Sequence, residues 1–541
     1  MTTATTPHRA GQRGGRNSFG QLLRAEWTKF RTVRGWLVGL AIAALLMVLV
    51  GLFGTGTSSN NCGSGGPTGQ SGRACLIRLP LGPDGEAVTD SFYFVRQPLA
   101  GDGSITVRVT ALTGLIPAAN ASGRIAVGQG PLRGMRHGLD QWAKAGLIIK
   151  ESTRQGSAYA AIMVTGGHGV QMQYNYTHDT AGQPGLVSAA APRWLRLTRT
   201  GDTLTGYESA DGGQWTEVGA ASLAGLSSTV QAGLFVTSPS YSQVTEQHIA
   251  FSSSVGGPTQ ATAVFDHVSL RGSRPRGGWT GSDIGGQAAY LAAPEPGGFH
   301  QAGGRFTVTG SGDIGPAVPG GSGGPTATIE DHLVGAFAGL IAVIVVAVMF
   351  ITAEYRRRLI RTTFAATPRR GRVLAAKAIV AGVVTFVVGL AAAVVAVTFG
   401  PQLSRDQGSY VFPVTTLTEV RVVIGTAALL AVAAVLALAI GVALRRSAAA
   451  VTAVIMAIVL PYLLAVAAVL PSGPADWLLR VTPAAAFAIQ QSIPLYPQVS
   501  GRYTPSNGYF PLAPWAGFAV LCGWTAVALG LAFFLLRRRD A

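Results

Sequence analysis

The chain has 541 residues, of which 48% are hydrophobic and only 12% are charged, and its formal net charge is +17. Soluble globular proteins carry about a quarter charged residues, so this composition indicates a membrane protein and excludes a disordered or collagen-like chain. Three cysteines exclude a disulfide-rich scaffold. The net charge alone leaves nucleic-acid binding open, and the positions of the basic residues have to decide.

Six apolar stretches are each long enough to cross a bilayer as a helix, which takes about 20 residues. They cover residues 36–53, 333–352, 378–399, 420–444, 447–470 and 512–536. The first stretch is short enough to suggest a cleaved signal peptide. Its apolar run is longer than a usual signal core and lacks a clear A-x-A site, so we favour a retained anchor.

Basic residues gather in four segments that alternate with these spans. The segments are the first 35 residues, the stretch after the second span, the Arg445–Arg446 pair and the final Arg537–Arg539 run, and they hold 20 basic residues against Glu26, Glu354 and Asp540. The positive-inside rule therefore predicts a multi-pass protein of the cytoplasmic membrane with both termini in the cytoplasm. Residues 54–330 are nearly balanced in charge. The net charge thus reflects topology, and no nucleic-acid partner is expected.

The long insert between the first two spans has the pattern of a β domain. In the run SITVRVTAL, Ile105, Val107, Val109 and Ala111 alternate with polar residues, as a half-buried strand requires. Similar short runs recur with Gly, Asp and Asn turns between them, which predicts an antiparallel β sandwich or jelly roll over 54–330. Glycine- and proline-rich stretches at 54–72 and 310–326 are expected to be flexible tethers. The predicted fold class is a six-helix membrane protein with an extracellular all-β insert.

Two groups of residues in the insert are candidates for special roles. Cys62 and Cys75 fall on the predicted outer side, where a disulfide can persist, and we expect a bridge with two free thiols as the alternative. Trp142, Trp194 and Trp215 could stack on sugar rings, although aromatic residues in a sandwich more often belong to the core. His168 and His178 lack the spacing of a metal site, and no metal is expected.

Residues 17–34, NSFGQLLRAEWTKFRTVR, form an amphipathic pattern before the first span. Phe19, Leu22, Leu23, Trp27, Phe30 and Val33 fall on one helical face, and basic residues lie elsewhere. Such a helix can lie among the lipid headgroups, which makes membrane lipids an expected partner. The alternative is a simple basic anchor that fixes orientation.

Three stretches resemble bacterial ABC-2 type permeases, the membrane subunits of ATP-binding cassette exporters. They are LLRAEWTKFRTVRGW before the first span, ITAEYRRRLIRTTFAATPRRGRVLAAKA after the second, and DWLLRVTPAAAFAIQQ between the fifth and sixth. The resemblance implies an elbow helix that includes Glu26, Trp27, Lys29 and Phe30. It also implies an ATPase-coupling region in the loop 353–377, at Glu354, Arg356, Thr362, Thr363, Pro368, Arg369, Arg370 and Lys377. The third stretch resembles the short extracellular helices of these permeases. The large first outer loop departs from the family's usual plan.

The energy source is expected on another chain. The sequence has no G-x-x-x-x-G-K-[ST] loop, and its spans lack the central ionisable residues that ion-coupled transporters use. We therefore expect a non-enzymatic permease subunit that uses ATP and Mg bound by a cytoplasmic ABC ATPase partner, with no cofactor on this chain. Permeases of this kind work as homodimers or heterodimers. The predicted parts are the N-terminus 1–35, the helix 36–53, the insert 54–330 and the helical region 333–541.

The insert also resembles a concanavalin-like jelly-roll module, found in bacterial secreted proteins that include glycosidases. The segments FVRQPLAGDGSITVRV, WAKAGLIIKES, WLRLTRTGDTLTGYESADGGQWTEVG and ATAVFDHVSL carry the resemblance. No carboxylate pair of the glycosidase type is evident, so catalysis is not expected. This resemblance leaves an alternative function, a membrane-anchored protein that binds or senses an extracellular glycan or peptide.

Overall fold

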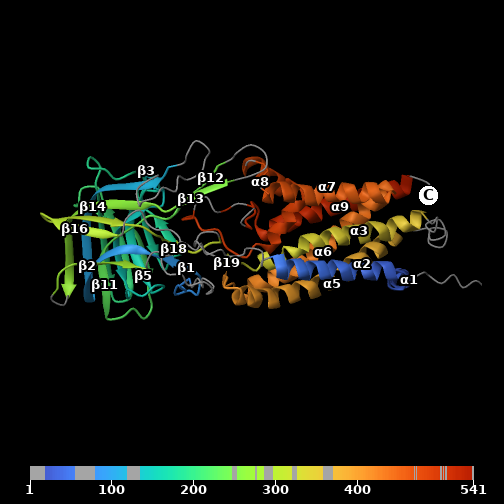
Figure 1. The fold of residues 1–541 in the computed structure, drawn as a ribbon, viewed down its shortest axis with the longest axis horizontal. Helices are drawn as coiled ribbons and strands as arrows, with labels where there is room; N and C mark the ends of the chain where they lie inside the picture. Colours follow the sequence, from blue (N-terminus) through green and yellow to red (C-terminus); the bar gives the residue numbers. More distant parts are fainter. Residues whose placement is uncertain are drawn as a thin grey trace, which may run out of the picture.

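A computed structural model describes residues 19–54, 79–118, 135–245, 253–273, 277–285, 297–319, 326–356, 370–467, 469–470, 472–499, 503, 505 and 508–538. The molecule is elongated, with a bundle of long helices at one end and a β domain at the other (Figure 1). The strands β1, β18 and β19 lie on the side of the β domain that faces the bundle (Figure 1).

Within the described residues, six helices are long and apolar enough to cross a membrane. They are α2 (Arg34–Gly54), α3 (Gly335–Arg356), α5 (Arg370–Asp406), α6 (Thr416–Leu444), α7 (Ser447–Val466) and α9 (Pro514–Arg538). All six predicted spans are confirmed, and α5 extends its predicted span at both ends. The predicted basic pair, Arg445 and Arg446, forms the turn between α6 and α7. Arg445 ends α6 in a left-handed conformation (φ 57°).

The segment between α7 and α9 folds back into the bundle. It contains α8 (Ser472–Val481) and the 3-10 helix η3 (Pro483–Gln490), and every residue of η3 is buried. Its small residues allow α9 to approach closely, since a Cβ at Gly517 would lie only 2.2 Å from the carbonyl oxygen of Ala485. The predicted short helices between the last two spans are therefore present.

The β domain is built from antiparallel strands. They are β1 (Val88–Asp90), β2 (Phe92–Pro117), β3 (Met135–His137), β4 (Lys144–Lys150), β5 (Tyr159–Thr165), β6 (Val170–Tyr174), β7 (His178–Ala181), β8 (Arg193–Thr200), β9 (Thr203–Ser209), β10 (Thr216–Ser222), β11 (Thr229–Thr237), β12 (Tyr241–Thr245), β13 (Ser253–Gly257), β14 (Gln260–Ser273), β15 (Thr280–Ile284), β16 (Gly298–Ala302), β17 (Arg305–Gly310) and β18 (Ile314–Pro316). The main path of the sheet runs β10-β9-β8-β2-β11-β4-β5-β6-β7. This arrangement confirms the predicted β sandwich on a helical membrane protein.

The strand β2 shows both the success and the limit of the alternation rule. Its residues Ile105, Val107 and Val109 are fully buried, as predicted. Ala111 is not buried, and Leu112 takes the inward position instead. The cause is an irregularity in the pairing with β14, where Val264 opposes Ala111 but Phe265 opposes Val109. An extra residue on one strand shifts the side chains that follow it to the opposite face.

The strands β4 and β5 are buried along their entire length, so both of their faces are covered. One face belongs to the main core between the sheets. The other packs on a second cluster that includes Val88 of β1, Tyr176 and Ile314 of β18. The chain itself therefore fills the face on which an open groove could otherwise form.

The β domain is docked on the bundle through ordered contacts. An apolar cluster joins Ala87 and Ala317 of the β domain to Phe412, Ile493 and Tyr509 of the inter-helix loops. A short parallel pair, β19 (Thr326–Ala327) and β20 (Tyr410–Val411), adds backbone hydrogen bonds. The stretch 310–326 was expected to be a flexible tether, but its apolar residue Ile314 is fully buried in β18. The other expected tether, 54–72, lies outside the described residues apart from Gly54.

Candidate functional site

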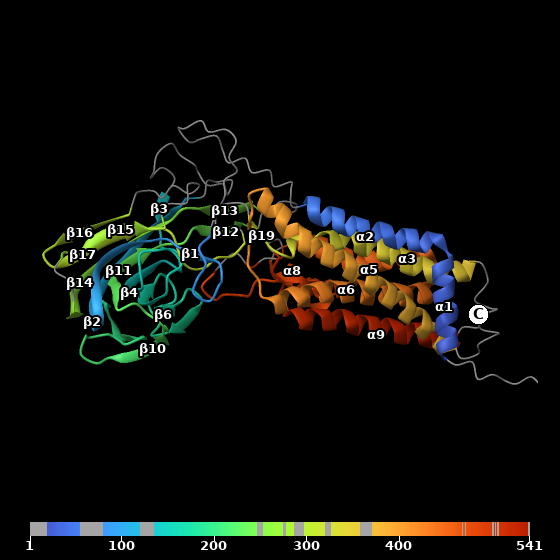
Figure 2. The ribbon, with the colours of Figure 1, turned by 90° about the horizontal axis from the view of Figure 1, so that it is seen from below.

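The helix α1 (Phe19–Thr32) crosses the end of the bundle that is remote from the β domain, at a steep angle to the long helices (Figure 2). It was expected to present one apolar face, and this face is divided in the structure. Phe30 is buried, whereas Trp27 and Val33 are 45% and 40% exposed. The buried side of α1 also carries a carboxylate, Glu26, which is fully buried.

Glu26 belongs to a buried network of four charges. The Nζ atom of Lys377, in α5, lies 2.6 Å from Glu26 Oε2 and 2.7 Å from Oε1 of Glu354, in the last turn of α3. Lys29 closes the network from the edge, with its Nζ 2.8 Å from Glu26 Oε1 and 3.4 Å from Glu354 Oε1. Two ammonium groups thus balance two carboxylates, and three helices that are distant in sequence are joined at one point.

Aromatic rings shield this network from solvent on one side. The Nζ of Lys377 lies 4.7 Å from the ring centroid of Phe350, one turn before Glu354 in α3. Phe30 and Trp36 pack edge-on against the same ring at 5.3 and 5.0 Å. A cation at this distance from an aromatic face is attracted by the ring, most strongly where water is excluded.

The two lysines of the network differ in exposure. The side chain of Lys377 is 1% exposed and that of Lys29 is 41% exposed. Burial lowers the pKa of Lys29, but its hydrogen bonds and charge interactions with Glu26 and Glu354 outweigh this effect, so that the pKa is raised above its ordinary value. Lys29 therefore stays charged at neutral pH, and Lys377 is the member that cannot exchange its partners for water.

All four lysines of this sequence lie in such ion pairs. Besides Lys29 and Lys377, Lys150 pairs with Asp90 and Lys144 pairs with Asp313 in the β domain. The other 37 basic residues are arginines. An ammonium group is a compact point charge that fits between two or three buried acceptors, whereas the planar guanidinium needs a wider site.

Sequence comparison decides the family. Residues 158–541, well over half of the chain, match the model of the ABC-2 family transporter proteins. The chain belongs to the ABC-2 transporter family. The matched residues include Glu354 and Lys377 but not α1 and α2.

Other comparisons add little. No curated protein matches this ABC-2 transporter. Among solved structures, a protein of unknown function from Saccharomyces cerevisiae is 15% identical, with 37% of this chain and 84% of the other covered and a TM-score of 0.22. Scytalido-glutamic peptidase with a transition-state analogue inhibitor is 10% identical, with 41% and 98% covered and a TM-score of 0.24. These TM-scores are too low for the similarity to indicate anything about the fold or function of the transporter.

The transporter's predicted elbow and coupling residues meet at the charge network. The structure brings together Glu26, Lys29, Glu354 and Lys377, which the sequence placed in two separate regions, and packs Phe30 beside them. Trp27 is 45% exposed, and Arg356 is exposed as well. Arg370 donates from Nη1 to the carbonyl of Leu536 at 2.7 Å and so holds the last turns of α9. Thr362, Thr363, Pro368 and Arg369 lie outside the described residues.

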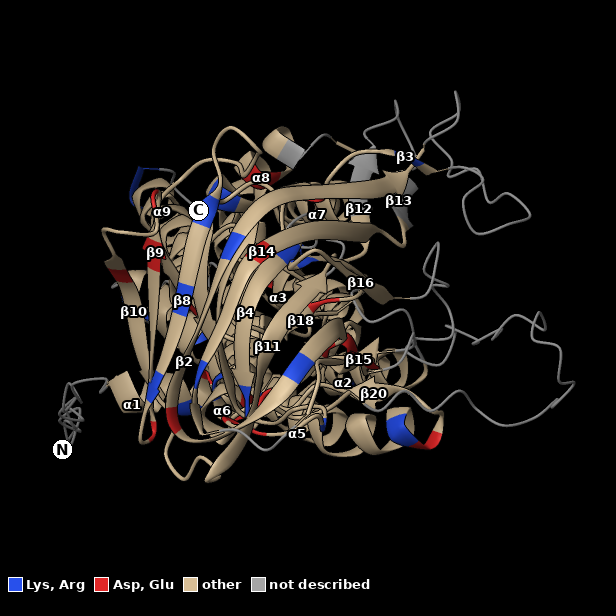
Figure 3. Ribbon diagram, turned by 90° about the vertical axis from the view of Figure 1, so that its left-hand side faces the viewer, with Lys and Arg blue, Asp and Glu red and all other residues tan. Residues whose placement is uncertain are grey.

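The three candidate tryptophans of the β domain are each in contact with other parts of the chain. Trp142 is 7% exposed and stacks on His168, with 3.9 Å between ring centroids. The guanidinium of Arg196 covers Trp215 at 3.8 Å, and Trp194 packs against the turn at Gly212. Figure 3 views the β domain from the side remote from the bundle and shows basic and acidic residues interspersed over it. The rings are occupied by contacts within the chain, which weakens their assignment to ligand stacking.

The remaining predictions concern a metal site and a disulfide. Within the described residues, no group of three or more His, Cys, Asp and Glu side chains could hold a metal ion. Cys62 and Cys75 lie outside the described residues, so the disulfide stays a prediction. The third cysteine, Cys522, is a free thiol in α9.

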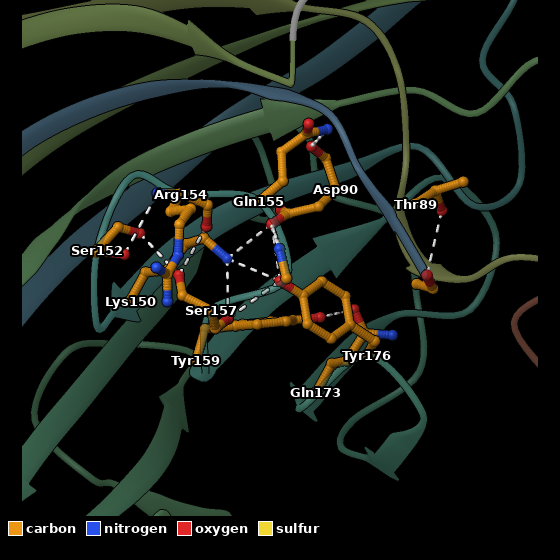
Figure 4. Close-up of polar contacts among 12 residues, drawn as sticks. Thr89, Asp90, Lys150, Ser152, Arg154, Gln155, Ser157, Tyr159, Gln173 and Tyr176 are labelled. Carbon is orange, nitrogen blue, oxygen red and sulfur yellow. Dashed lines mark hydrogen bonds and ion pairs between the residues drawn. The ribbon is translucent and has the colours of Figure 1, made fainter. Parts of the chain in front are cut away.

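Sequence reasoning missed a second buried charge site, at the base of the β domain (Figure 4). The Nζ of Lys150 donates to Asp90 Oδ2 and to the hydroxyl of Tyr176, both at 2.8 Å, and neither Lys150 nor Asp90 is exposed. Tyr176 adopts a left-handed conformation (φ 67°), which is unusual for an aromatic residue. Burial lowers the pKa of Lys150, and the charge of Asp90 opposes this effect. A lysine at each end of the apolar run AGLII, in so lysine-poor a chain, was the available signal.

This second site also touches the helical part of the transporter. Gln498, in the loop before α9, donates from Nε2 to the backbone carbonyl of Tyr176 at 3.0 Å. Gln498 is 4% exposed, so the bond is shielded from water. The strained turn of the β domain is therefore held from one side by the Lys150–Asp90 pair and from the other by the bundle.

One carboxyl group of the β domain should give a measurable pH dependence. Burial raises the pKa of Asp140 from 3.8 to about 6, although the backbone N–H of Trp142 donates to it. Because the folded state binds this proton more tightly, the contribution of Asp140 to the free energy of unfolding falls as pH rises from about 4 to 6. Asp140→Asn keeps the acceptor and removes the charge, so it should stabilise the protein at pH 7 by on the order of 1–2 kcal/mol.

Thermal unfolding of the purified chain at pH 7 and near pH 4 measures this effect. We expect the difference between Asp140→Asn and the wild type to shrink as the pH falls, because the native carboxyl group becomes protonated. A variant that is less stable than the wild type at pH 7, or a difference that is equal at both pH values, would contradict the assignment.

Proposed function

We propose that this chain is the permease subunit of an ATP-binding cassette exporter. Its spans would carry a substrate across the cytoplasmic membrane with energy from ATP hydrolysed on a separate subunit. Membership of the ABC-2 family supports a role as a transport membrane component and implies an ATP-binding partner. Two permease chains, identical or different, would pair with two ATPases. The ATP and Mg would be bound by the ATPases, and this chain would have no enzymatic activity of its own.

The buried charge network is the observation that carries this proposal. Glu354 lies two residues before the end of α3, and Lys377 lies two turns after the start of α5. The segment that joins these helices, residues 357–369, contains four of the predicted coupling positions, namely Thr362, Thr363, Pro368 and Arg369. A displacement of this segment would be transmitted along α3 to Glu354 and along α5 to Lys377. Their bonds to Glu26 would then pass the displacement to α1, so that the three helices move as one unit.

The charge distribution supports the proposed orientation. The end of the bundle at which α1 crosses carries basic residues of the described chain, including Arg537 and Arg538 in the last turn of α9. The positive-inside rule assigns this end to the cytoplasm, where an ATPase would bind. The β domain, at the opposite end, would then be extracellular (Figure 1). ATP-driven closure of the ATPases would shift the bundle between inward-open and outward-open states.

Charge reversal at Arg369 tests the docking site. If this segment binds the ATPase, Arg369→Glu should lower the amount of ATPase that is recovered with the tagged permease by about tenfold. This is the effect of losing roughly 1.4 kcal/mol of binding free energy. Arg31→Glu is the matched control, because Arg31 is an exposed arginine of α1 at the same end of the bundle. The ATPase to be used is a Walker-motif protein that co-purifies with the tagged wild-type permease. Equal recovery with both variants would contradict docking at this loop.

A second variant separates binding from coupling. Glu354→Gln keeps the size of the side chain and removes the carboxylate that Lys377 and Lys29 share. The variant should still bind the ATPase, but its link from α3 to α1 would be weakened. We expect normal recovery of the complex in the pull-down and lower transport per ATP hydrolysed in vesicles. Unchanged transport by Glu354→Gln would show that the network is structural and not part of coupling.

A further inference from the structure

A groove lies between α1 and α5. Its volume is about 310 Å³, and its walls include Leu23, Arg24 and Trp27 of α1 and Ile379, Val383 and Val384 of α5. Trp27, Ile379 and Val383 are each 44% to 56% exposed, so the groove opens to the surface of the bundle. Apart from Arg24, these walls are apolar.

The basic segments offer few carboxylates to Arg24. The acidic residues of the basic segments are Glu26, Glu354 and Asp540, and no Asp or Glu occurs in 1–18 or 357–369. Glu26 and Glu354 are both engaged by Lys29 and Lys377 in the buried network. Among the described residues, no ion pair involves Arg24. The exposed guanidinium of Arg24 is therefore available to an anion from outside the chain.

We propose that this groove binds one acyl chain of an anionic phospholipid whose phosphate is held by Arg24. The apolar walls match a hydrocarbon chain, and the free guanidinium at the rim matches a phosphate. An exposed tryptophan on an amphipathic helix is typical of the membrane–water interface, where phosphate and acyl chain meet. Arg372 lies on the same face of α5 as Ile379, two turns nearer the helix start, and is also exposed.

The position of the groove gives the lipid a specific effect on the protein. The same helix α1 binds the network through Glu26 and the lipid through Arg24, which lies two residues earlier. A bound acyl chain would fill the space between α1 and α5 and hold α1 against the bundle. Anionic lipid is therefore expected to stabilise the elbow against local unfolding without any ATPase present.

The test measures lipid binding to the full-length permease alone, so that it is independent of the proposed ATPase coupling. The purified protein is titrated with phosphatidylglycerol or phosphatidylcholine in detergent, and bound lipids are counted by native mass spectrometry. We expect tighter binding of phosphatidylglycerol, and Arg24→Gln should weaken it about fivefold, the effect of removing one basic residue near a membrane surface. Soluble glycerol phosphate should not compete, because it lacks the acyl chain.

Two further variants make the outcome decisive. Arg31→Gln removes an exposed arginine of α1 that does not line the groove, and it should leave binding within about twofold of the wild type. Val383→Trp fills the groove and should weaken binding of both lipids. Equal losses for Arg24→Gln and Arg31→Gln would overturn the proposal, because they would show diffuse attraction to the basic surface. Competition by glycerol phosphate would also overturn it, in favour of a simple anion site.

Discussion

Replacing Lys377 with methionine should destabilise the helical bundle by about 3–5 kcal/mol, the usual cost of leaving a buried charge without its partner. The substitution keeps much of the side-chain volume but removes the ammonium group between Glu26 and Glu354. Lys29 cannot replace it, because it approaches from the exposed edge. The two carboxylates would then repel each other, and α1 should detach from α3 and α5.

Thermal unfolding of the purified protein and tryptic cleavage within α1 measure this effect. The matched control is Lys29→Ala, which removes the other lysine of the same network. Since Lys29 is 41% exposed, its loss should cost less than about 1 kcal/mol. The triple variant Glu26→Gln, Glu354→Gln, Lys377→Met removes all three buried charges and leaves only Lys29, which is 41% exposed, so it should regain most of the lost stability. Equal losses for the two single variants would show that burial of Lys377 does not govern the network.

The second large effect is expected in the β domain, from Lys150→Met. Lys150 is fully buried, and its loss would leave the Asp90 carboxylate without a cation, with only the hydroxyl of Tyr176 and the backbone N–H of Gly156 as donors. We expect a loss of about 3–5 kcal/mol. The loss has a second cause, because Tyr176 would keep its left-handed backbone without the ammonium group that fixes its ring.

Two variants separate these causes. Arg154→Ala removes an exposed basic residue of the neighbouring loop and should change stability by less than about 0.5 kcal/mol. Asp90→Asn combined with Lys150→Met removes both charges and should be more stable than Lys150→Met alone. Thermal unfolding, followed by circular dichroism in the β region, gives the comparison. A double variant as unstable as the single one would show that strain at Tyr176, and not the unpaired carboxylate, causes the loss.

The spans were predictable because each is a long apolar run, and bilayer thickness sets their length. The elbow and coupling residues were also found, but as two separate regions. Nothing in the spacing of Glu26 and Lys377 shows that they bond, because they are 351 positions apart in the sequence. A contact of this kind depends on how α1 crosses the bundle, which is a property of packing and not of local pattern.

The β domain shows the same limit. The alternation in β2 predicted Ile105, Val107 and Val109 correctly and failed at Ala111, because a pairing irregularity with β14 has no local signature. Lys150 was overlooked because a charged residue at the end of an apolar run is expected to mark a strand terminus at the surface. Its burial follows from the turn that brings Tyr176 and Asp90 to the same point.

The contact between Gln498 and Tyr176 has a mechanical consequence. The loop that contains Gln498 joins η3 to α9. Through Gln498 the β domain is hydrogen-bonded to this loop, which adjoins the fully buried helix η3. A small rotation of α9 would be amplified along the length of the β domain, as at the end of a lever (Figure 1). The distance from a label on the far strands to the membrane surface would then change strongly when the helices change their arrangement. The orientation of the insert would therefore indicate the arrangement of the helices.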